Sequence, residues 1–583
     1  MNKLKNLFCL FFVAFFAQIL IAQNTQEPLL IIGSDSIYPS EFITTYSKNN
    51  DFQKATEQDL REYLDLFINF KLKVKEGENL KIDTVPRFKA ELKSYEKQSS
   101  QQYLVDKEVT DLLLHEAYER SRYYLRASHI LFACDKNAEP KDTLLVYNKA
   151  LQVRNQILNG EISFADAAVK YSEDPSARDF VNPQTGRSHV GNRGDLGFFS
   201  VFDLVYPFES GAFNTPVGQI SLPVRTQFGY HLIYVTRKID AVQNISVEQI
   251  YLNDTTAKRG LMLPTTKERI LAIQADLKAG KSFEELVPIY TEDKATANNN
   301  GLMEPFSPNH RHGDFVEAVL NLKLHEISQP IASQTGWHIV KLMGIENYEL
   351  NDQMKAEIKN QISRDSRSYK SKESFVAKLK KDYQYDEKNR AKGLKYVMAK
   401  LPADFFSGVP SERPTLPKDI RKVKPLCTFG DTAITTEFFF IHISRYRGLE
   451  LNKTQAMKFL NERLDYLVEE KLIQYEYAHL MDKYPEYRAL QKEFHDGMVL
   501  YEMNTEKVWA AAMKDSTGLE KFYQQNLTKY VDPQTSLPQP LDEIRAVVIT
   551  DYQEYLDKKW IAELREKYQP VLNEKVFNNL LKR

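Results

Sequence analysis

The amino-acid sequence predicts a multidomain α+β protein, with mixed strand-and-helix domains between mainly helical modules. Its 583 residues are several times the size of an ordinary domain, so at least three domains are expected. Two internal repeats support this division, one shared by the two ends of the chain and one between them. Hydrophobic residues make up 42% and charged residues 27%, which is typical of folded domains. Gly (22) and Pro (24) are too few for a disordered or collagen-like chain.

Charge and motif content exclude several classes of function. The chain has 78 basic and 79 acidic residues and a net charge of −1, so no basic surplus favours nucleic acid as a partner. The sequence contains no CxxC, HExxH, GxGxxG or Walker-type motif, and we expect neither a metal nor a cofactor. Cys134 and Cys427 lie in unlike contexts and are predicted to be structural thiols.

Residues 1–22 have the layout of a secretory signal peptide. Lys3 and Lys5 precede an almost wholly apolar run over 7–17, and a small residue stands before the polar stretch that follows. The alternative is an uncleaved membrane anchor, but Gln18 interrupts the apolar segment, which falls short of the ~20 residues that a spanning helix needs. We therefore expect export to the periplasm, cleavage of the signal and no membrane span in the mature chain.

Two mainly helical modules are predicted at the ends of the chain, over 23–124 and 425–583. Arg61–Leu80 and Asn461–Leu480 agree at seven of twenty positions without a gap, and the apolar residues of each recur at helical spacing. A helix with one apolar stripe cannot bury that stripe alone, so we predict that the two modules pack together. Residues 347–424 are predicted to be a charged helical segment followed by a proline-rich linker.

Between these modules lie two copies of a strand–helix–strand pattern, over 125–238 and 244–346. Two stretches of the first copy match the second: Ser163–Asp174 with Ser282–Asp293, and Ile220–His231 with Ile327–His338. Each copy begins with an apolar strand, continues through helices and closes with a strand, which predicts two mixed domains of the same fold.

Four separated motifs of the first copy carry the most specific signal: Arg126–Leu131, Tyr171–Asp174, Gly194–Phe199 and Thr226–His231. In this order they resemble the motifs of parvulin-type peptidyl-prolyl cis-trans isomerases. The signal peptide, the tandem domains and the helical flanks together resemble exported chaperones of the SurA and PpiD type. The resemblance implies two tandem parvulin-like domains, each an antiparallel sheet with helices, flanked by mainly α-helical chaperone modules.

The resemblance also implies a site in the first copy. His129 and His231 match paired histidines on neighbouring central strands. Thr226 would hydrogen-bond this pair, and Asp174 occupies the place where some relatives carry a cysteine; these four are the predicted catalytic residues. The predicted substrate-binding residues are Leu196, Leu204, Phe208 and Phe228. Two roles stay open for the histidines, since they could brace the site or act electrostatically.

The chemistry of proline isomerisation agrees with such a site. Rotation about the planar X–Pro amide faces a barrier of ~18–20 kcal/mol and takes ~10–100 s without catalysis. Catalysis needs an apolar slot for the proline ring and a polar floor that favours the twisted amide, but no covalent nucleophile. A Ser-His-Asp hydrolase is not favoured, because no serine stands in a strand-to-helix elbow.

The second copy departs from the pattern at its site. Three positions change: Gln249 replaces His129, Glu304 replaces Gly197 and His325 replaces Gly218. Four are retained: Asp293, Met303, Phe315 and His338. We therefore expect weak or no isomerase activity from this copy. Residues 310–312 read His-Arg-His, but no further ligand stands at a suitable spacing, and a surface loop is predicted there.

Two functions follow from these patterns. The first is a periplasmic folding factor that binds unfolded exported or outer-membrane proteins and isomerises their X–Pro bonds through residues 125–238. The alternative is a pure holdase chaperone without significant isomerase activity. Most of the chain serves no isomerase purpose, which favours binding of unfolded chains as the main role.

Overall fold

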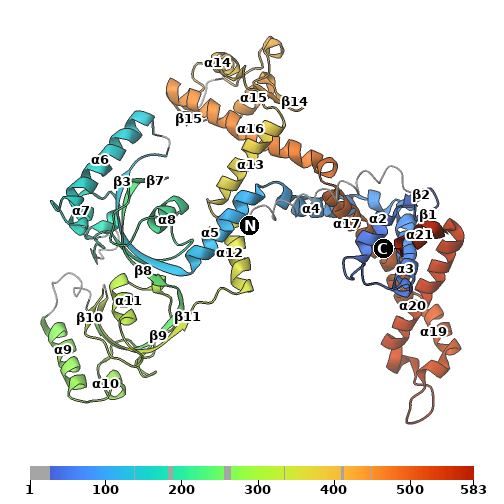
Figure 1. Cartoon of the computed structure of the whole chain (residues 1–583), viewed down its shortest axis with the longest axis horizontal. Coiled ribbons are helices and arrows are strands. Elements are labelled where there is room, and N and C mark those ends of the chain that lie inside the picture. Colours follow the sequence, from blue (N-terminus) through green and yellow to red (C-terminus); the bar gives the residue numbers. More distant parts are fainter. Residues whose placement is uncertain are drawn as a thin grey trace. The chain divides into compact units, whose positions relative to one another are not determined.

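The computed structural model describes residues 27–136, 138–181, 188–254, 264–333, 335–408, 412–446 and 448–582 (Figure 1). The predicted signal peptide lies outside these residues. The chain forms two compact units, one made of residues up to Tyr103 together with residues from Ile473, and one made of Leu104–Leu472. Within the described ranges, no helix combines the length and the hydropathy needed to cross a membrane.

The first unit is built from both ends of the chain. Strand β1 (Leu30–Ile32) pairs with β2 (Asp35–Ile37) on one side and with β16 (Val571–Leu572) on the other. The main helices are α2 (Pro39–Tyr46), α3 (Glu57–Asn79), α4 (Pro86–Ser100), α17 (Pro485–Asn504), α18 (Ala510–Lys514), α19 (Ser516–Gln525), α20 (Leu541–Tyr568) and α21 (Glu574–Leu580). Helix α3, from the N-terminal part of the chain, packs against the C-terminal helices α17 and α20 (Figure 1).

Apolar side chains from both ends fill one core in this unit. The ring of Phe42 meets Phe67 edge-on at 5.5 Å and Phe577 at 6.3 Å between centroids. A Cβ at Gly77 of α3 would lie 2.3 Å from the Val499 side chain of α17, so only glycine allows this approach of the two helices. The prediction that the two ends of the chain pack together is confirmed for these residues.

The borders of the terminal modules differ from those predicted. Residues 104–124 and 425–472 belong to the second unit. The reason is packing of α5 (Lys107–Ser121) against α12 (Asp352–Arg364) and α13 (Ser368–Asp382), which gives its apolar face a partner outside the first unit.

Truncation after Lys483, which removes α17 to α21, is expected to unfold α2, α3 and α4. Their core residues would lose the side chains that cover them, and burial of each large apolar side chain contributes about 1.5–3 kcal/mol. Far-UV circular dichroism should then show a loss of helix larger than the removed residues account for. N-terminal helices that stay folded and soluble in the truncated chain would contradict this expectation.

The two central domains of the second unit share one plan. The first has an antiparallel sheet in the order β6-β3-β8-β7, and the second has the order β10-β11-β9. The first contains β3 (Tyr123–Ala133), α6 (Pro140–Leu158), α7 (Phe164–Tyr171), β4 (Phe180–Val181), β5 (Ser188–His189), β6 (Asp195–Phe199), α8 (Tyr206–Phe213), β7 (Val224–Thr226) and β8 (Gly229–Asp240). The second contains β9 (Val242–Asn253), α9 (Pro264–Lys278), α10 (Phe283–Tyr290), α11 (Gly313–Leu320), β10 (Ile331–Ala332) and β11 (Gly336–Asn347). The predicted pair of antiparallel sheets with helices is confirmed.

The central domains also share a core. Phe198 of β6 packs among buried residues of the second domain, which include Val247 of β9 and Phe315 of α11. Arg126 of β3 forms an ion pair with Asp195 of its own domain at 2.7 Å and another with Asp314 of the second domain. The two copies are therefore packed against each other and not joined only by the chain.

A helical module follows the second copy. After α12 and α13 it contains α14 (Arg390–Lys400), β12 (Ser407–Gly408), β13 (Cys427–Phe429), β14 (Thr432–Ile434), α15 (Thr436–Ile443), β15 (Leu449–Glu450) and α16 (Lys453–Lys483). The order β13-β14-α15-α16 repeats the order β1-β2-α2-α3. Leu464, Val468 and Leu472 of α16 are buried, as are their counterparts Leu64, Ile68 and Leu72 of α3. The residues shared by the two sequence repeats therefore form the same buried helical face in α3 and in α16.

Both described cysteines, Cys134 and Cys427, are buried free thiols.

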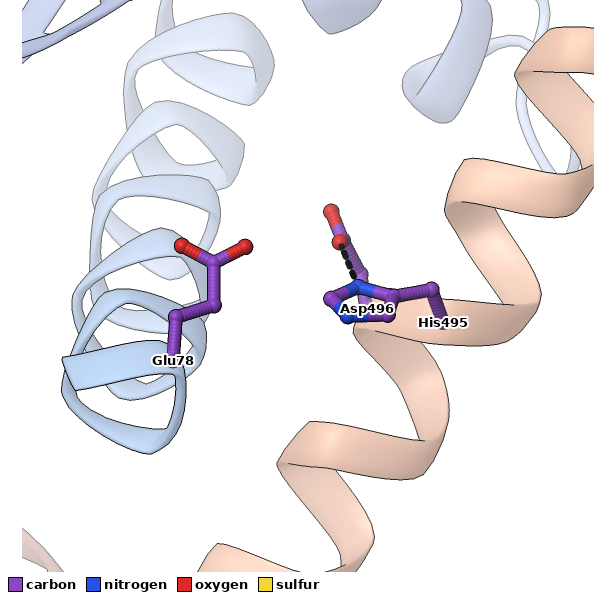
Figure 2. Close-up of side chains that lie close together, drawn as sticks. All are labelled: Glu78, His495 and Asp496. Carbon is purple, nitrogen blue, oxygen red and sulfur yellow. Dashed lines mark hydrogen bonds and ion pairs between the residues drawn. The ribbon is translucent and has the colours of Figure 1, made fainter. Parts of the chain in front are cut away.

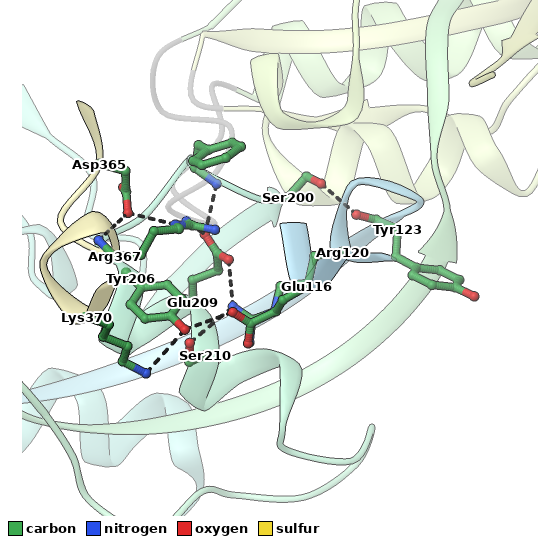
Figure 3. A network of polar contacts seen from close by, with 11 residues as sticks. Glu116, Arg120, Tyr123, Ser200, Tyr206, Glu209, Ser210, Asp365, Arg367 and Lys370 are labelled. Carbon is green, nitrogen blue, oxygen red and sulfur yellow. Dashed lines mark hydrogen bonds and ion pairs between the residues drawn. The ribbon is translucent and has the colours of Figure 1, made fainter. Parts of the chain in front are cut away.

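A buried ion-pair network attaches the first central domain to nearby helices (Figure 3). Glu209 of α8 is fully buried and accepts hydrogen bonds from Arg120 of α5 at 2.8 Å and from Arg367, just before α13, at 2.7 Å. The backbone N–H of Phe202 also donates to Glu209 at 2.9 Å. Because α8 carries Phe208, this network fixes the helix that borders the site described next.

Candidate active site

Two histidines on neighbouring strands form the centre of the site. In the β3–β8 ladder Leu131 lies opposite His231 and His129 lies opposite Ile233, so both histidines point to the same face of the sheet. Their rings are nearly parallel, with centroids 5.6 Å apart and the two Nδ1 atoms 3.3 Å apart. Both side chains are buried.

One polar side chain flanks each histidine. Oδ2 of Asp174, which follows α7, lies 2.9 Å from His129 Nε2. Oγ1 of Thr226, at the end of β7, lies 2.8 Å from His231 Nε2. The structure therefore brings the four predicted catalytic residues into one continuous row: Asp174, His129, His231 and Thr226.

The row constrains where protons reside. An ionised Asp174 only accepts, so His129 Nε2 carries a proton. The hydrogen bond from His129 holds the pKa of Asp174 well below its usual range despite partial burial. Burial, and then the neighbouring His129, lower the pKa of His231 to about 3, so this ring is neutral near pH 7. A neutral His231 has one donor and one acceptor nitrogen, so it donates in one of its two contacts, with Thr226 or with His129, and accepts in the other.

The His231 ring is expected to stay neutral at pH 5, whereas an ordinary histidine with a pKa near 6.5 would be mostly charged. As the pH falls from about 6.5 towards 3, the unfolded chain binds a proton at His231, whereas the folded chain does not. The free energy of unfolding therefore decreases over this range. Ring carbon and nitrogen NMR shifts measured between pH 8 and 4 test this. Titration of His231 near pH 6.5 would contradict the assignment.

An apolar wall lies beside the polar row. Phe208 of α8 meets both histidine rings edge-on, at 5.8 Å from His129 and 5.2 Å from His231. Leu196 and Leu204 pack against the same cluster as Phe208. Phe228, in the turn between β7 and β8, is 53% exposed and lies outside that cluster. Three of the predicted substrate-binding residues therefore form one wall, and the fourth stands at an exposed rim.

Two serines that position Asp174 were not predicted. Oγ of the fully buried Ser172 accepts the backbone N–H groups of Leu131 and Asp174, at 3.2 and 3.3 Å. Asp174 in turn accepts the backbone N–H of Ser176 at 2.9 Å, closing a turn over Pro175. The Asp-Pro-Ser sequence is a recognisable turn signal that could have indicated this.

Comparison with known proteins agrees with this geometry. A family model described as "Rotamase: PPIC-type PPIASE domain" matches residues 129–237 and 254–344. Both segments are parvulin-type domains. The first parvulin domain contains the row of Asp174, His129, His231 and Thr226.

Curated relatives and solved structures are similar over part of the chain. Chaperone SurA of Methylococcus capsulatus is 25% identical over 37% of this chain and 45% of the relative, and Chaperone SurA of Xylella fastidiosa (strain 9a5c) is 25% identical over 47% and 57%. The chain thus spans about half the length of the curated relatives it matches. Among solved structures, the peptidylprolyl isomerase PrsA from Bacillus anthracis has 25% identity over 24% of this chain and 60% of that chain, with a TM-score of 0.17. NmPin, the parvulin of Nitrosopumilus maritimus, has 28% identity over 20% and 96%, with a TM-score of 0.15.

The second parvulin domain keeps the polar row in altered form. Gln249 donates to Asp293 at 2.9 Å and its Oε1 lies 3.0 Å from His338 Nδ1, while Ser333 Oγ lies 2.8 Å from His338 Nε2. Burial, and then the charge of Arg311, lower the pKa of His338 to about 4. The substitution of His129 by Gln249 therefore preserves the hydrogen-bonded row, because an amide can donate to the carboxylate and accept from the histidine at once.

Glu78, His495 and Asp496 are the group of side chains in the described chain closest to a metal-binding arrangement (Figure 2). Glu78 of α3 faces His495 and Asp496 of α17, with Asp496 Oδ1 hydrogen-bonded to His495 Nδ1 at 3.1 Å. Lys71 Nζ lies 2.7 Å from the other Asp496 oxygen. Its ammonium already neutralises that carboxylate and would repel a metal ion, so the group fits a buried hydrogen-bond network better than a metal centre.

Proposed function

We propose that this chain is a folding factor of the periplasm that catalyses cis-trans isomerisation of X–Pro bonds and binds unfolded exported proteins, including outer-membrane proteins. The observation that carries the isomerase assignment is the row of Asp174, His129, His231 and Thr226 beside the wall formed by Phe208. The substrate segment would lie between this wall and the rim residue Phe228.

The mechanism that fits this arrangement is non-covalent. The wall of Leu196, Leu204 and Phe208 would hold the proline ring while the chain on one side of the amide rotates. The twisted amide has lost resonance and carries less separated charge than the planar amide, so an apolar slot favours it more than water does. Asp174 and Thr226 position the two histidines, whose rings form a rigid polar floor that needs no proton transfer.

Binding of unfolded chains is supported by exposed apolar side chains in the first unit. Tyr501, Trp509 and Met513 are 59%, 40% and 72% exposed, and the rings of Tyr501 and Trp509 meet at 5.6 Å. Tyr501 lies in α17, Trp509 ends the π-helical turn that follows it, and Met513 lies in α18, and the ring contact places Tyr501 and Trp509 side by side. A cluster of exposed aromatic and flexible side chains suits the apolar stretches of unfolded proteins.

Two assays on the intact chain test the proposal. Exchange NMR on a proline-containing peptide measures isomerisation, and light scattering of a diluted, unfolded outer-membrane protein measures suppression of aggregation. We expect activity in both. Suppression without catalysis would overturn the isomerase assignment and leave the holdase alternative, while catalysis without suppression would overturn the chaperone role.

A further inference from the structure

The apolar wall of the first parvulin site is not reproduced in the second. Of the four equivalent positions, one keeps its residue type, since Phe208 corresponds to Phe315, and three change: Leu196 to Met303, Leu204 to Arg311 and Phe228 to Thr335. One leucine thus becomes a cation, and the exposed rim phenylalanine becomes a hydroxyl side chain. A slot shaped for a proline ring between apolar walls is therefore replaced by a slot with one charged side.

Arg311 lies along the wall that leads to the second polar row. Its guanidinium stacks over the ring of Phe306 at 5.3 Å, and Phe306 lies 5.9 Å from Phe315. The ring of Phe315 in turn lies 5.2 Å from His338. Phe306 corresponds to Phe199 of the first domain, whose cluster Leu204 contacts, so Arg311 occupies the place of Leu204 in space as well as in sequence.

The Arg311 guanidinium is exposed and has no carboxylate partner within the part of the chain that the structure describes. The nearby acids have other partners: Asp293 accepts from Gln249, and Asp314 and Glu317 pair with Arg126. Glu304, at the place of Gly197, is exposed and forms no ion pair with Arg311. The second site therefore presents one unsatisfied positive charge next to a polar floor.

We propose that the second parvulin domain is a binding site for extended peptide segments that carry a glutamate or aspartate side chain, which pairs with Arg311. A guanidinium can donate two parallel hydrogen bonds to a carboxylate, and stacking on Phe306 holds its plane in position for this. The row of Asp293, Gln249, His338 and Ser333 is connected by hydrogen bonds throughout and forms the floor of the site. This site would select acidic segments of client chains, and the inference does not depend on the first domain being an active isomerase.

Binding of two labelled peptides to the full chain tests the proposal. The peptides have amidated C-termini and differ only in a glutamate or a glutamine beside the proline, so the only carboxylate is that of the glutamate. An exposed ion pair of roughly 1 kcal/mol predicts about fivefold tighter binding of the glutamate peptide. The preference should fall as salt is raised from 20 to 300 mM.

Matched variants test whether Arg311 causes the preference for the glutamate peptide. Arg311→Leu, which restores the residue type of the first domain, should abolish the preference, whereas Arg364→Leu, the same charge change at an exposed residue of α12, should leave it intact. Asp174→Ala alters only the first site and should also leave it intact, which separates this test from the isomerase assay. Equal affinity of the two peptides for the unmodified chain, or a preference that survives in Arg311→Leu, would overturn the proposal. Thermal unfolding of each variant confirms that it is folded.

Discussion

Replacement of Asp174 by alanine in the full chain is expected to lower the catalysed rate of X–Pro isomerisation by about 10- to 100-fold. A hydrogen bond to a charged group contributes about 1.5–3 kcal/mol, and each 1.36 kcal/mol of barrier is a factor of about ten. Without the 2.9 Å contact to Asp174, the His129 ring loses the partner that fixes its orientation and protonation. His231, which contacts His129 through Nδ1, would be displaced in turn.

The matched control is Asp293→Ala, the equivalent change in the second parvulin domain. It removes the contact of Asp293 with Gln249, but the catalysed rate is expected to stay within about twofold of the unmodified chain. Exchange NMR of one proline-containing peptide on both variants makes the comparison. Equal losses in the two variants, or a larger loss in Asp293→Ala, would mean that the active site has been assigned to the wrong copy.

Replacement of Glu209 by alanine is expected to destabilise the second unit by about 3–5 kcal/mol, because one carboxylate pairs with two buried arginines and its removal takes a partner from both. Arg367 and Glu209 are both fully buried, and Arg367 Nη1 has no partner among the described residues (Figure 3). Without Glu209, the Arg367 guanidinium would keep one carboxylate partner, Asp365. Arg120 would lose its carboxylate partner on α8 and keep its contacts with Ser210 and Glu116.

Urea unfolding of the full chain measures the effect, read from the transition that abolishes isomerase activity. Glu119→Ala is the control, since Glu119 lies on α5 in an exposed pair with Arg122 and should change stability by about 0.5 kcal/mol or less. A loss of stability of less than about 1 kcal/mol in Glu209→Ala would show that solvent or side-chain rearrangement compensates both arginines in the folded chain.

The sequence by itself predicted the four members of the polar row, through the resemblance of their motifs to those of parvulin-type isomerases. Each member lies in a short motif whose strand or turn is specified locally, and alternation along β3 and β8 places His129 and His231 on one face. The sequence also determined the buried face of α3 and of α16, because helical periodicity is a local property that survives in both copies.

Other features depended on contacts between distant residues. Glu209 gives no signal in the sequence, since nothing local shows that a glutamate of an eight-residue helix meets arginines 89 positions before it and 158 positions after it. The module borders were misplaced for the same reason, because α5 belongs to the unit that covers its apolar face and not to the segment that precedes it.

In the second parvulin domain, too, the sequence predicted one part of the site and the tertiary structure decided the rest. The sequence alone showed that Gln249 replaces a histidine, which predicted a damaged site. Only the tertiary structure showed that the amide bridges Asp293 and His338, because the orientation of a side chain is set by the partners that folding brings to it. The position of Arg311 over Phe306 was likewise decided by packing, since a loop residue receives its surroundings from elements far away in the chain.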